Sequence, residues 1–141
     1  MPDVTFASDF IVGFPTETES EYLETEKFIS DVGFTHLHIF PYSKRAGTPA
    51  AEMDGQVPDA VRVERASRLD AKRREIAYKL AEKYIGVQKE VLFELCEDGR
   101  ATGHTPEFLE VAVITDKDLH NEVRTVKING YDGSVFTGFI V

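Results

Sequence analysis

The stretch DFIVGFPTETESEYLE, residues 9–24, constrains the fold of this chain more than any other part of its sequence. Its run Phe10-Ile11-Val12 has the continuous apolar pattern of a strand buried on both faces, and we expect a strand over residues 4–12. Gly13 and Pro15 then end that strand, because glycine and proline interrupt regular pairing. The chain must therefore turn sharply after residue 12.

A helix and a second strand follow this turn. Thr18, followed three residues later by Glu21, is a capping-box pattern that predicts the start of a helix, and Gly33 predicts its end. The segment FTHLHIFPY, residues 34–42, alternates apolar and polar side chains as a strand does. Strand, helix and strand make a βαβ unit, so we expect the two strands to be parallel.

The chain changes character near residue 85. Residues 43–57 predict an irregular loop, and Pro58 suits the first turn of a long helix that Gly86 closes. Beyond it lie four short β-type runs separated by turn signals, KEVLFEL, FLEVAVIT, EVRTVKI and SVFTGFI. Strands at this spacing, without intervening helices, predict a small antiparallel barrel. The expected fold class is α/β followed by all-β.

Composition excludes several classes of protein. The single cysteine, Cys96, excludes an internal disulfide and an all-cysteine metal or iron–sulfur site made by these residues alone. It suits a reducing cytoplasm, and it has no nearby basic activator, so we expect an unreactive, packed thiol. No apolar run reaches the ~20 residues of a membrane span. The net charge of -9 argues against a protein that binds nucleic acid through bulk charge.

The charge is unevenly distributed along the chain. Eight basic and five acidic residues lie between Asp59 and Tyr84, whereas residues 86–141 carry five basic and ten acidic residues. The basic segment is therefore a candidate phosphate-contacting face. The plainer interpretation is a solvated helix face with internal pairs such as Asp70 with Arg74.

The loops after the two predicted strands form the candidate ligand site, because parallel α/β folds bind ligands at the carboxyl ends of their strands. VGFPTET follows the first strand and FPYSKRAGT the second. Glutamates at the helix start would repel a phosphate, so a neutral or positive ligand fits better. Gly13 and Pro15 could equally serve only to end the strand. His36 and His38 share one strand face and could bind a metal, but two ligands leave a metal site incomplete, and a packing or helix-facing role is simpler.

Two segments taken together resemble a known family. SDFIVGFPTETESEYLETEKFI followed by VGFTHLHIFPYSKRAGTPAA resembles the end of the radical-SAM domain in the MiaB/RimO-type methylthiotransferases. HLHIFPYSKR is most similar to the branch that thiomethylates threonylcarbamoyladenosine in tRNA. The resemblance implies that residues 1–57 are the C-terminal part of a radical-SAM barrel and that residues 58–85 are a linker helix. Residues 86–141 are similar to the TRAM domain, a small RNA-binding β-barrel.

The resemblance also implies a chemistry and a set of site residues. The family adds sulfur and a methyl group to an adenosine beside the anticodon, using S-adenosylmethionine and two iron–sulfur clusters. The positions that match the cofactor's adenine contacts are Ile11, Val12, Gly13, Phe40 and Tyr42. The implied partner is a tRNA anticodon stem-loop. Its phosphates would contact the helix and the loop that follows the second strand, through Arg65, Arg68, Lys72, Lys44 and Arg45.

The sequence departs from the family in three respects. The three-cysteine cluster motif, the earlier barrel strands and the N-terminal cluster domain have no counterpart here, so we expect a C-terminal part that holds no cofactor alone and performs no radical chemistry alone. Thr16 stands where the family usually has glycine. The barrel segment is acidic, so RNA contact must use local patches or the basic helix.

Two other interpretations remain open. The chain could be a free-standing module that binds RNA or a protein and has no catalytic role, or it could be part of another parallel α/β enzyme. Self-association through the exposed edge of the half-barrel would favour the free-standing module or be an artefact of the open edge, because an open strand edge tends to pair with a copy of itself.

Overall fold

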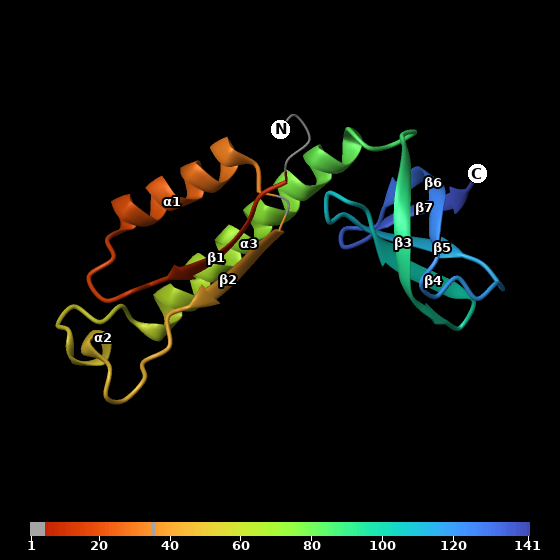
Figure 1. Cartoon of the computed structure of the whole chain (residues 1–141). Helices are drawn as coiled ribbons and strands as arrows, with labels where there is room; N and C mark the ends of the chain where they lie inside the picture. Colours follow the sequence, from red (N-terminus) through yellow and green to blue (C-terminus); the bar gives the residue numbers. More distant parts are fainter. Residues whose placement is uncertain (1–4, 35) are drawn as a thin grey trace. The chain divides into compact units, whose positions relative to one another are not determined.

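The computed structural model describes residues 5–34 and 36–141, and the chain divides into two compact units (Figure 1). The first unit comprises residues 6–76, and the second comprises residues 77–141 together with Thr5. No helix in the described residues is long and apolar enough to cross a membrane.

The first unit contains the predicted βαβ arrangement. Strand β1 (Ala7–Val12), helix α1 (Glu19–Val32) and strand β2 (His36–Pro41) follow one another along the chain. The two strands are parallel, and their register runs from Ala7 opposite His36 to Val12 opposite Pro41. The prediction of a parallel pair is therefore confirmed.

Helix α1 begins and ends where the sequence predicts. The Thr18 backbone N–H donates to Glu21 Oε2 at 2.7 Å, and Thr18 Oγ1 accepts from the Glu21 N–H at 3.3 Å, which completes a capping box. Gly33 adopts the left-handed conformation with φ 69° and donates its N–H to the Ile29 carbonyl at 3.1 Å. A residue with a β-carbon would be strained in that conformation, which explains the glycine.

The two faces of the β1–β2 sheet differ in exposure. On one face Phe10 packs against Phe28 of α1 and against Phe34, with ring centroids 6.4 Å and 5.6 Å away. On the other face Ile11 is 57% exposed and Phe40 is 50% exposed. The prediction of a strand buried on both faces is therefore wrong for β1 in this chain, because a helix layer covers only one face.

The segment after β2 contains two helices. A short helix, α2 (Pro49–Glu52), lies within the predicted irregular loop and is capped by Thr48, whose Oγ1 accepts from the Ala51 N–H at 3.3 Å. The long helix α3 (Asp59–Glu82) begins directly after Pro58, as predicted, and extends from the first unit into the second.

The second unit is a closed barrel of five strands in the spatial order β3-β4-β5-β7-β6. Its core consists of buried apolar side chains from all five strands, with Val91, Phe93, Val111, Val126 and Ile128 fully enclosed. The strands are β3 (Gln88–Glu97), β4 (Arg100–His104), β5 (Glu110–Ile114), β6 (Val123–Tyr131) and β7 (Phe136–Ile140). The predicted small barrel is thus present.

The barrel differs from the prediction in two details. Strand β4 was not predicted, and β5 pairs with β7 in parallel, so the barrel is not wholly antiparallel. Next to a register shift in β3, Gly103 of β4 lies so close to its neighbour that a β-carbon would be 2.0 Å from the Leu92 carbonyl oxygen. Only glycine fits there, because the β-bulge brings the two backbones together.

Candidate functional site

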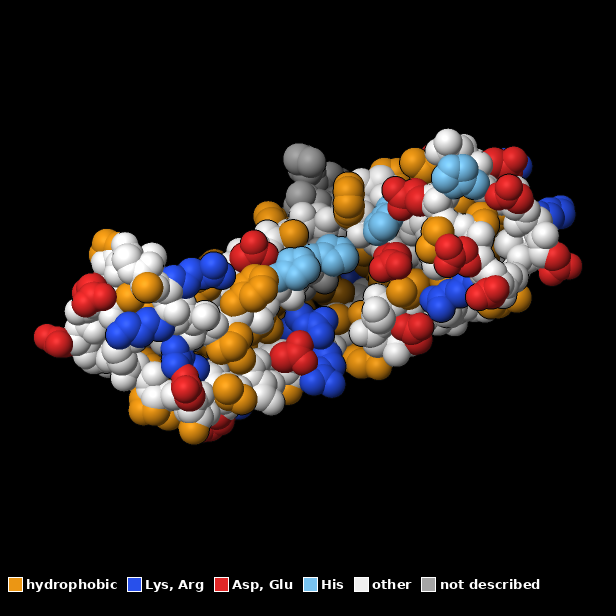
Figure 2. Space-filling view, turned by 90° about the horizontal axis from the view of Figure 1, so that it is seen from below, with side chains coloured by type: hydrophobic (Ala, Val, Ile, Leu, Met, Phe, Trp, Pro, Cys, Tyr) orange, Lys and Arg blue, Asp and Glu red, His pale blue; other side chains and the backbone are white. Residues whose placement is uncertain are grey.

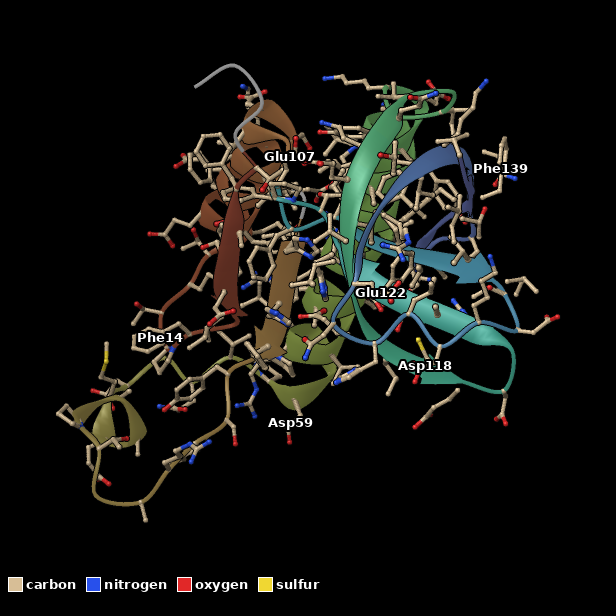
Figure 3. All side chains as sticks on the ribbon, turned by 45° about the vertical axis from the view of Figure 1, so that its right-hand side comes forward. Phe14, Asp59, Glu107, Asp118, Glu122 and Phe139 are labelled. Carbon is tan, nitrogen blue, oxygen red and sulfur yellow. The ribbon has the colours of Figure 1, made fainter. Side chains whose placement is uncertain are left out.

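The loops after β1 and β2 lie side by side at the carboxyl ends of the strands. The Tyr42 N–H donates to the Val12 carbonyl at 2.8 Å, which continues the strand pairing one residue beyond β2. Phe14, labelled in Figure 3, stands edge-on to the Tyr42 ring at 5.3 Å between centroids. The two loops that the sequence singles out therefore form one continuous surface.

Ile11 and Phe40 are brought together on the open face of the sheet. They are partners in the strand register, and both side chains are about half exposed. The rings of His38 and Phe40 stack at 6.4 Å, and Figure 2 shows histidine and hydrophobic side chains beside one another on the face it displays. The result is an apolar, aromatic surface of the kind on which a flat heterocycle can rest.

Val12 and Gly13 lie differently from Ile11. The Val12 side chain is 1% exposed and belongs to the helix-covered face, so only its backbone reaches the loop surface. Gly13 has φ 71°, and its N–H donates to Glu17 Oε2 at 2.9 Å. A β-carbon at Gly13 would be 2.3 Å from Arg62 Cγ, so the close approach of α3 requires a glycine at this position.

Tyr42 is half-buried between the loops. Its carbonyl accepts from Arg62 Nη1 at 2.6 Å, and the Arg62 guanidinium lies 5.8 Å from the Tyr42 ring centroid. The Tyr42 hydroxyl is buried and has no hydrogen-bond partner among the described residues. A buried hydroxyl without a partner is costly, so this atom is a candidate donor or acceptor for a ligand.

Arg65 is not a surface residue. It is 5% exposed, with Nη1 donating to Glu17 Oε1 at 2.6 Å and Nη2 to Glu19 Oε2 at 3.2 Å. Neither Arg62 nor Glu17 was predicted to be a site residue. The available signal was the spacing of Arg62 and Arg65, which places two arginines on one helix face, three residues apart.

The other predicted phosphate contacts remain partly accessible. Arg68 donates to Glu19 at 3.0 Å and to Glu26 at 3.3 Å, and Lys72 donates to Glu75 at 3.1 Å, yet their side chains are 38% and 31% exposed. Lys44 and Arg45 are exposed in the loop after β2. Acidic residues thus neutralise much of the basic segment, and Lys44 and Arg45 are more open than the helix residues.

The ion pairs between α1 and α3 change the ionisation of several groups. A hydrogen bond from Arg68 lowers the pKa of Glu19, and the same contact raises the pKa of Arg68. Burial raises the pKa of Tyr22 to about 12. Tyr22 is fully buried, and the Arg68 and Arg65 guanidinium groups lie 4.7 Å and 5.4 Å from its ring centroid. Glu19 and Arg68 therefore stay charged at neutral pH, and Tyr22 stays neutral.

The remaining candidates do not assemble into a metal centre. No group of three or more His, Cys, Asp or Glu residues in the described parts of the chain could hold a metal ion. His36 and His38 are exposed on the open sheet face and do not face a helix. Cys96 is half-buried, and its Sγ accepts from the Leu119 N–H at 3.3 Å, which agrees with a packed thiol.

Comparison with known proteins relates the chain to tRNA-modifying enzymes. No family model matches it. It is 39% identical over 133 residues to the threonylcarbamoyladenosine tRNA methylthiotransferase MtaB of Bacillus subtilis, covering 91% of this chain and 30% of that protein. It is 38% identical over 126 residues to the tRNA-2-methylthio-N(6)-dimethylallyladenosine synthase of Aquifex aeolicus, covering 89% of this chain and 29% of that protein.

A third relative agrees with these two. The tRNA-2-methylthio-N(6)-dimethylallyladenosine synthase of Ehrlichia chaffeensis is 36% identical over 146 residues, covering 99% of this chain and 33% of that protein. The chain thus spans about a third of the length of the curated relatives it matches. The resemblance to the MiaB/RimO-type methylthiotransferases is confirmed over nearly the whole length of this chain.

Proposed function

We propose that this chain is the C-terminal part of a tRNA methylthiotransferase that thiomethylates a modified adenosine next to the anticodon. The observation that carries the proposal is the identity of 36–39% with three such enzymes over 89–99% of the chain. The highest of these identities is to the enzyme named for threonylcarbamoyladenosine, which supports that branch. We also propose a cytoplasmic location for this chain, because its relatives are enzymes that act on tRNA.

The proposal includes a division of the chain into three parts. We assign residues 1–57 to the end of a radical-SAM barrel, residues 58–85 to a linker helix, and residues 86–141 to a TRAM domain. The parallel β1–β2 pair supports the first assignment, and the closed five-stranded barrel supports the last. Neither feature is unique to this family.

The described residues fit one cofactor of such an enzyme and not the other. S-adenosylmethionine supplies the radical and the methyl group when it is bound to the complete enzyme. Ile11 and Phe40 offer its adenine an apolar wall, and the backbone at Val12 and Gly13 ends that wall. The buried Tyr42 hydroxyl, which lacks a hydrogen-bond partner in the described parts of the chain, is available to the ligand. One cysteine cannot ligate an iron–sulfur cluster, so two clusters would have to be held outside these residues, and we expect this chain alone to be inactive.

The proposed RNA contacts lie on the first unit. We propose Lys44 and Arg45 as the principal phosphate contacts, because both are exposed, with Arg68 and Lys72 in support. Arg65 was predicted together with them. To reach a phosphate it would have to leave Glu17 and Glu19, at the cost of a buried ion pair.

The alternative is a free-standing module that binds RNA or a protein. The exposed apolar face of the β1–β2 sheet favours it, because a self-sufficient domain would pair two copies through this face or its open edges. In a complete enzyme the same face would line the interior of the barrel and be available to the cofactor, so a functional replacement distinguishes the two proposals.

The test is a chimera. The matching segment of the Bacillus subtilis relative is replaced by this chain, and the chimera is expressed in cells that lack that enzyme. Methylthiolated adenosine in digested tRNA is then measured by mass spectrometry, with the native enzyme and an empty vector as controls. Methylthiolation by the chimera supports the proposal. A folded chimera without product contradicts it and favours the free-standing module.

A further inference from the structure

Two arginines of α3 point at the loops of the candidate site and not at solvent. Arg62 and Arg65 are separated by one helical turn, and their side chains are 15% and 6% exposed. Long cationic side chains are rarely buried unless they are paired. Their partners in the first unit therefore indicate what they hold in place.

Arg65 holds the loop after β1 through Glu17. Its Nη1 donates both to Glu17 Oε1 at 2.6 Å and to the Glu17 carbonyl at 3.1 Å, and Glu17 Oε2 accepts from the Gly13 N–H at 2.9 Å. One carboxylate thus joins the helix to the first residue of the loop. A second tie comes from Thr16, whose N–H donates to the Gly55 carbonyl at 2.8 Å.

The conformation of this loop needs such restraint. Gly13 and Thr16 both have positive φ, 71° and 72°. Glycine adopts this conformation freely, but a β-branched threonine does so only when its surroundings enforce it. The resembled family usually has glycine at position 16, which would favour this left-handed turn. Threonine at this position changes the side chain, but the backbone keeps the turn.

Arg62 contacts both loops at once. Its Nη1 donates to the Tyr42 carbonyl at 2.6 Å, after β2, and its Cγ occupies the space that a β-carbon on Gly13 would need, after β1. The second terminal nitrogen of Arg62, Nη2, pairs with the Asp59 carboxylate. The Arg62 side chain therefore fixes the spacing between the two strand ends.

We propose that Arg62, Arg65 and Glu17 form a loop clamp that positions the backbone at Gly13 and Tyr42 for ligand binding. The clamp residues are positioning residues, since they act through the loops. The inference rests on the proposed function only in taking these loops as the cofactor-binding surface. It assigns Arg65 a role inside the protein in place of a phosphate contact.

Arginine is required at position 65 by geometry. Its planar guanidinium reaches the Glu17 carboxylate, the Glu17 carbonyl and Glu19 together, whereas a lysine ammonium is a point charge that cannot reproduce this fork. Arg65→Lys should therefore retain part of the clamp, and Arg65→Met should lose it. Glu17→Gln should lose it as well, because the amide replaces one of the two accepting oxygens with an NH2 donor, which would face the donor of Arg65 or of Gly13.

The direct test is hydrogen exchange of the Gly13 amide, measured by NMR on the full 141-residue chain. We expect exchange to accelerate by about tenfold or more in Arg65→Met and Glu17→Gln, with Arg65→Lys between these and the unaltered chain. Arg74→Met is the matched control, because Arg74 is 59% exposed and pairs with Asp70 of the same helix. Amides in the middle of α3 report any general loss of stability. Unchanged Gly13 exchange in Arg65→Met would overturn the clamp.

The functional test uses the chimera described above. We expect Arg65→Met to raise KM for S-adenosylmethionine by about tenfold with a smaller change in kcat, Arg65→Lys to recover part of it, and Arg74→Met to have no effect. Faster Gly13 exchange with an unmoved KM would overturn the positioning role. An inactive unaltered chimera would contradict the proposed function instead, and the Gly13 exchange data would then decide whether the clamp exists.

Discussion

Burial of a single residue, Tyr22, makes the free energy of unfolding of the chain depend on pH in the alkaline range. Its side chain is fully enclosed, its hydroxyl donates to the Arg65 carbonyl at 3.1 Å, and burial raises its pKa to about 12. An unfolded tyrosine ionises near pH ~10. The unfolded chain therefore loses this proton before the folded chain does, and the contribution of Tyr22 to stability is complete below pH ~10 and is lost as the pH rises toward about 12.

We predict that the free energy of unfolding of the unaltered chain falls between pH ~10 and ~11 by about 1 kcal/mol more than that of Tyr22→Phe. Phenylalanine has no ionisable group, so the difference between the two curves isolates Tyr22 from the other groups that titrate there. Urea denaturation at each pH measures it. Tyr78→Phe, which alters a half-exposed ring, is the control. Parallel curves for the unaltered chain and Tyr22→Phe would contradict the burial argument.

At the scale of the element, the clearest local determinant is the capping box of α1. Thr18 and Glu21 satisfy each other's backbone N–H groups, which would otherwise lack partners in the first turn of a helix. We predict that Thr18→Ala lowers the free energy of unfolding by about 1 kcal/mol. Thr25→Ala, within the same helix, is the matched control, since Thr25 Oγ1 donates to the Glu21 carbonyl inside the helix and caps no backbone N–H among the described residues, and alanine favours the helix.

Urea denaturation followed by circular dichroism gives both values. An equal loss of stability in Thr18→Ala and Thr25→Ala would mean that the cap contributes nothing specific. A loss in Thr18→Ala alone would show that a four-residue sequence pattern fixes the start of this helix.

Features encoded by neighbouring residues could be predicted from the sequence, and features made by distant residues could not. Thr18, Glu21 and Gly33 identify both ends of α1, and alternating side chains identify β2. Strand β4 was not predicted, because its inward-facing residues are Ala101 and Gly103. Both are too small to give a hydrophobic pattern. The parallel pairing of β5 with β7 was not predicted, because a local sequence pattern does not show which strand lies next to another.

The same distinction applies to the candidate site. Gly13 and the apolar residues near it were recognisable, because the strand-to-helix turn is local. The burial of Arg65 was not, because its partners Glu17 and Glu19 lie 48 and 46 residues away in the sequence. An arginine in a basic helix ordinarily suggests a solvated or phosphate-binding side chain. Here the acidic start of α1 folds against it and neutralises it.

At the scale of the whole molecule, the net charge of -9 opposes RNA binding, so any binding must come from local contacts. We predict that this chain binds labelled anticodon stem-loop RNA weakly, with an affinity that falls steeply as salt rises. Lys44→Glu with Arg45→Glu should reduce the slope of log affinity against log salt by about 2, about one for each phosphate that the variant no longer binds. Fluorescence anisotropy at several salt concentrations measures this slope.

The matched control for RNA binding is Lys117→Glu with Arg124→Glu, which makes the same change of charge in the other unit. An equal loss of slope in both double variants would mean that only net charge matters. Binding that does not change with salt would contradict the proposed phosphate contacts, because counterion release accompanies every such contact.

Self-association is predicted to respond to salt in the opposite direction. Ile11 and Phe40 leave an apolar patch on the open face of the β1–β2 sheet, and burial of such a patch against a second copy is favourable. Two copies that each carry a charge of -9 repel one another, and salt screens that repulsion. Sedimentation velocity should therefore show a dimer fraction that increases with both protein and salt concentration.

The variant Ile11→Lys with Phe40→Lys should abolish this dimer. The two added lysines change the net charge from -9 to -7, which weakens the repulsion between copies, so a loss of dimer must come from the apolar face and not from charge. Leu95→Lys with Phe139→Lys makes the same change of charge at half-exposed apolar residues of the barrel and should leave the dimer intact. Loss of the dimer in this control pair alone would place the contact on the barrel. A monomer at every salt concentration would mean that the open face does not pair with a copy of itself, which removes the main support for a free-standing module.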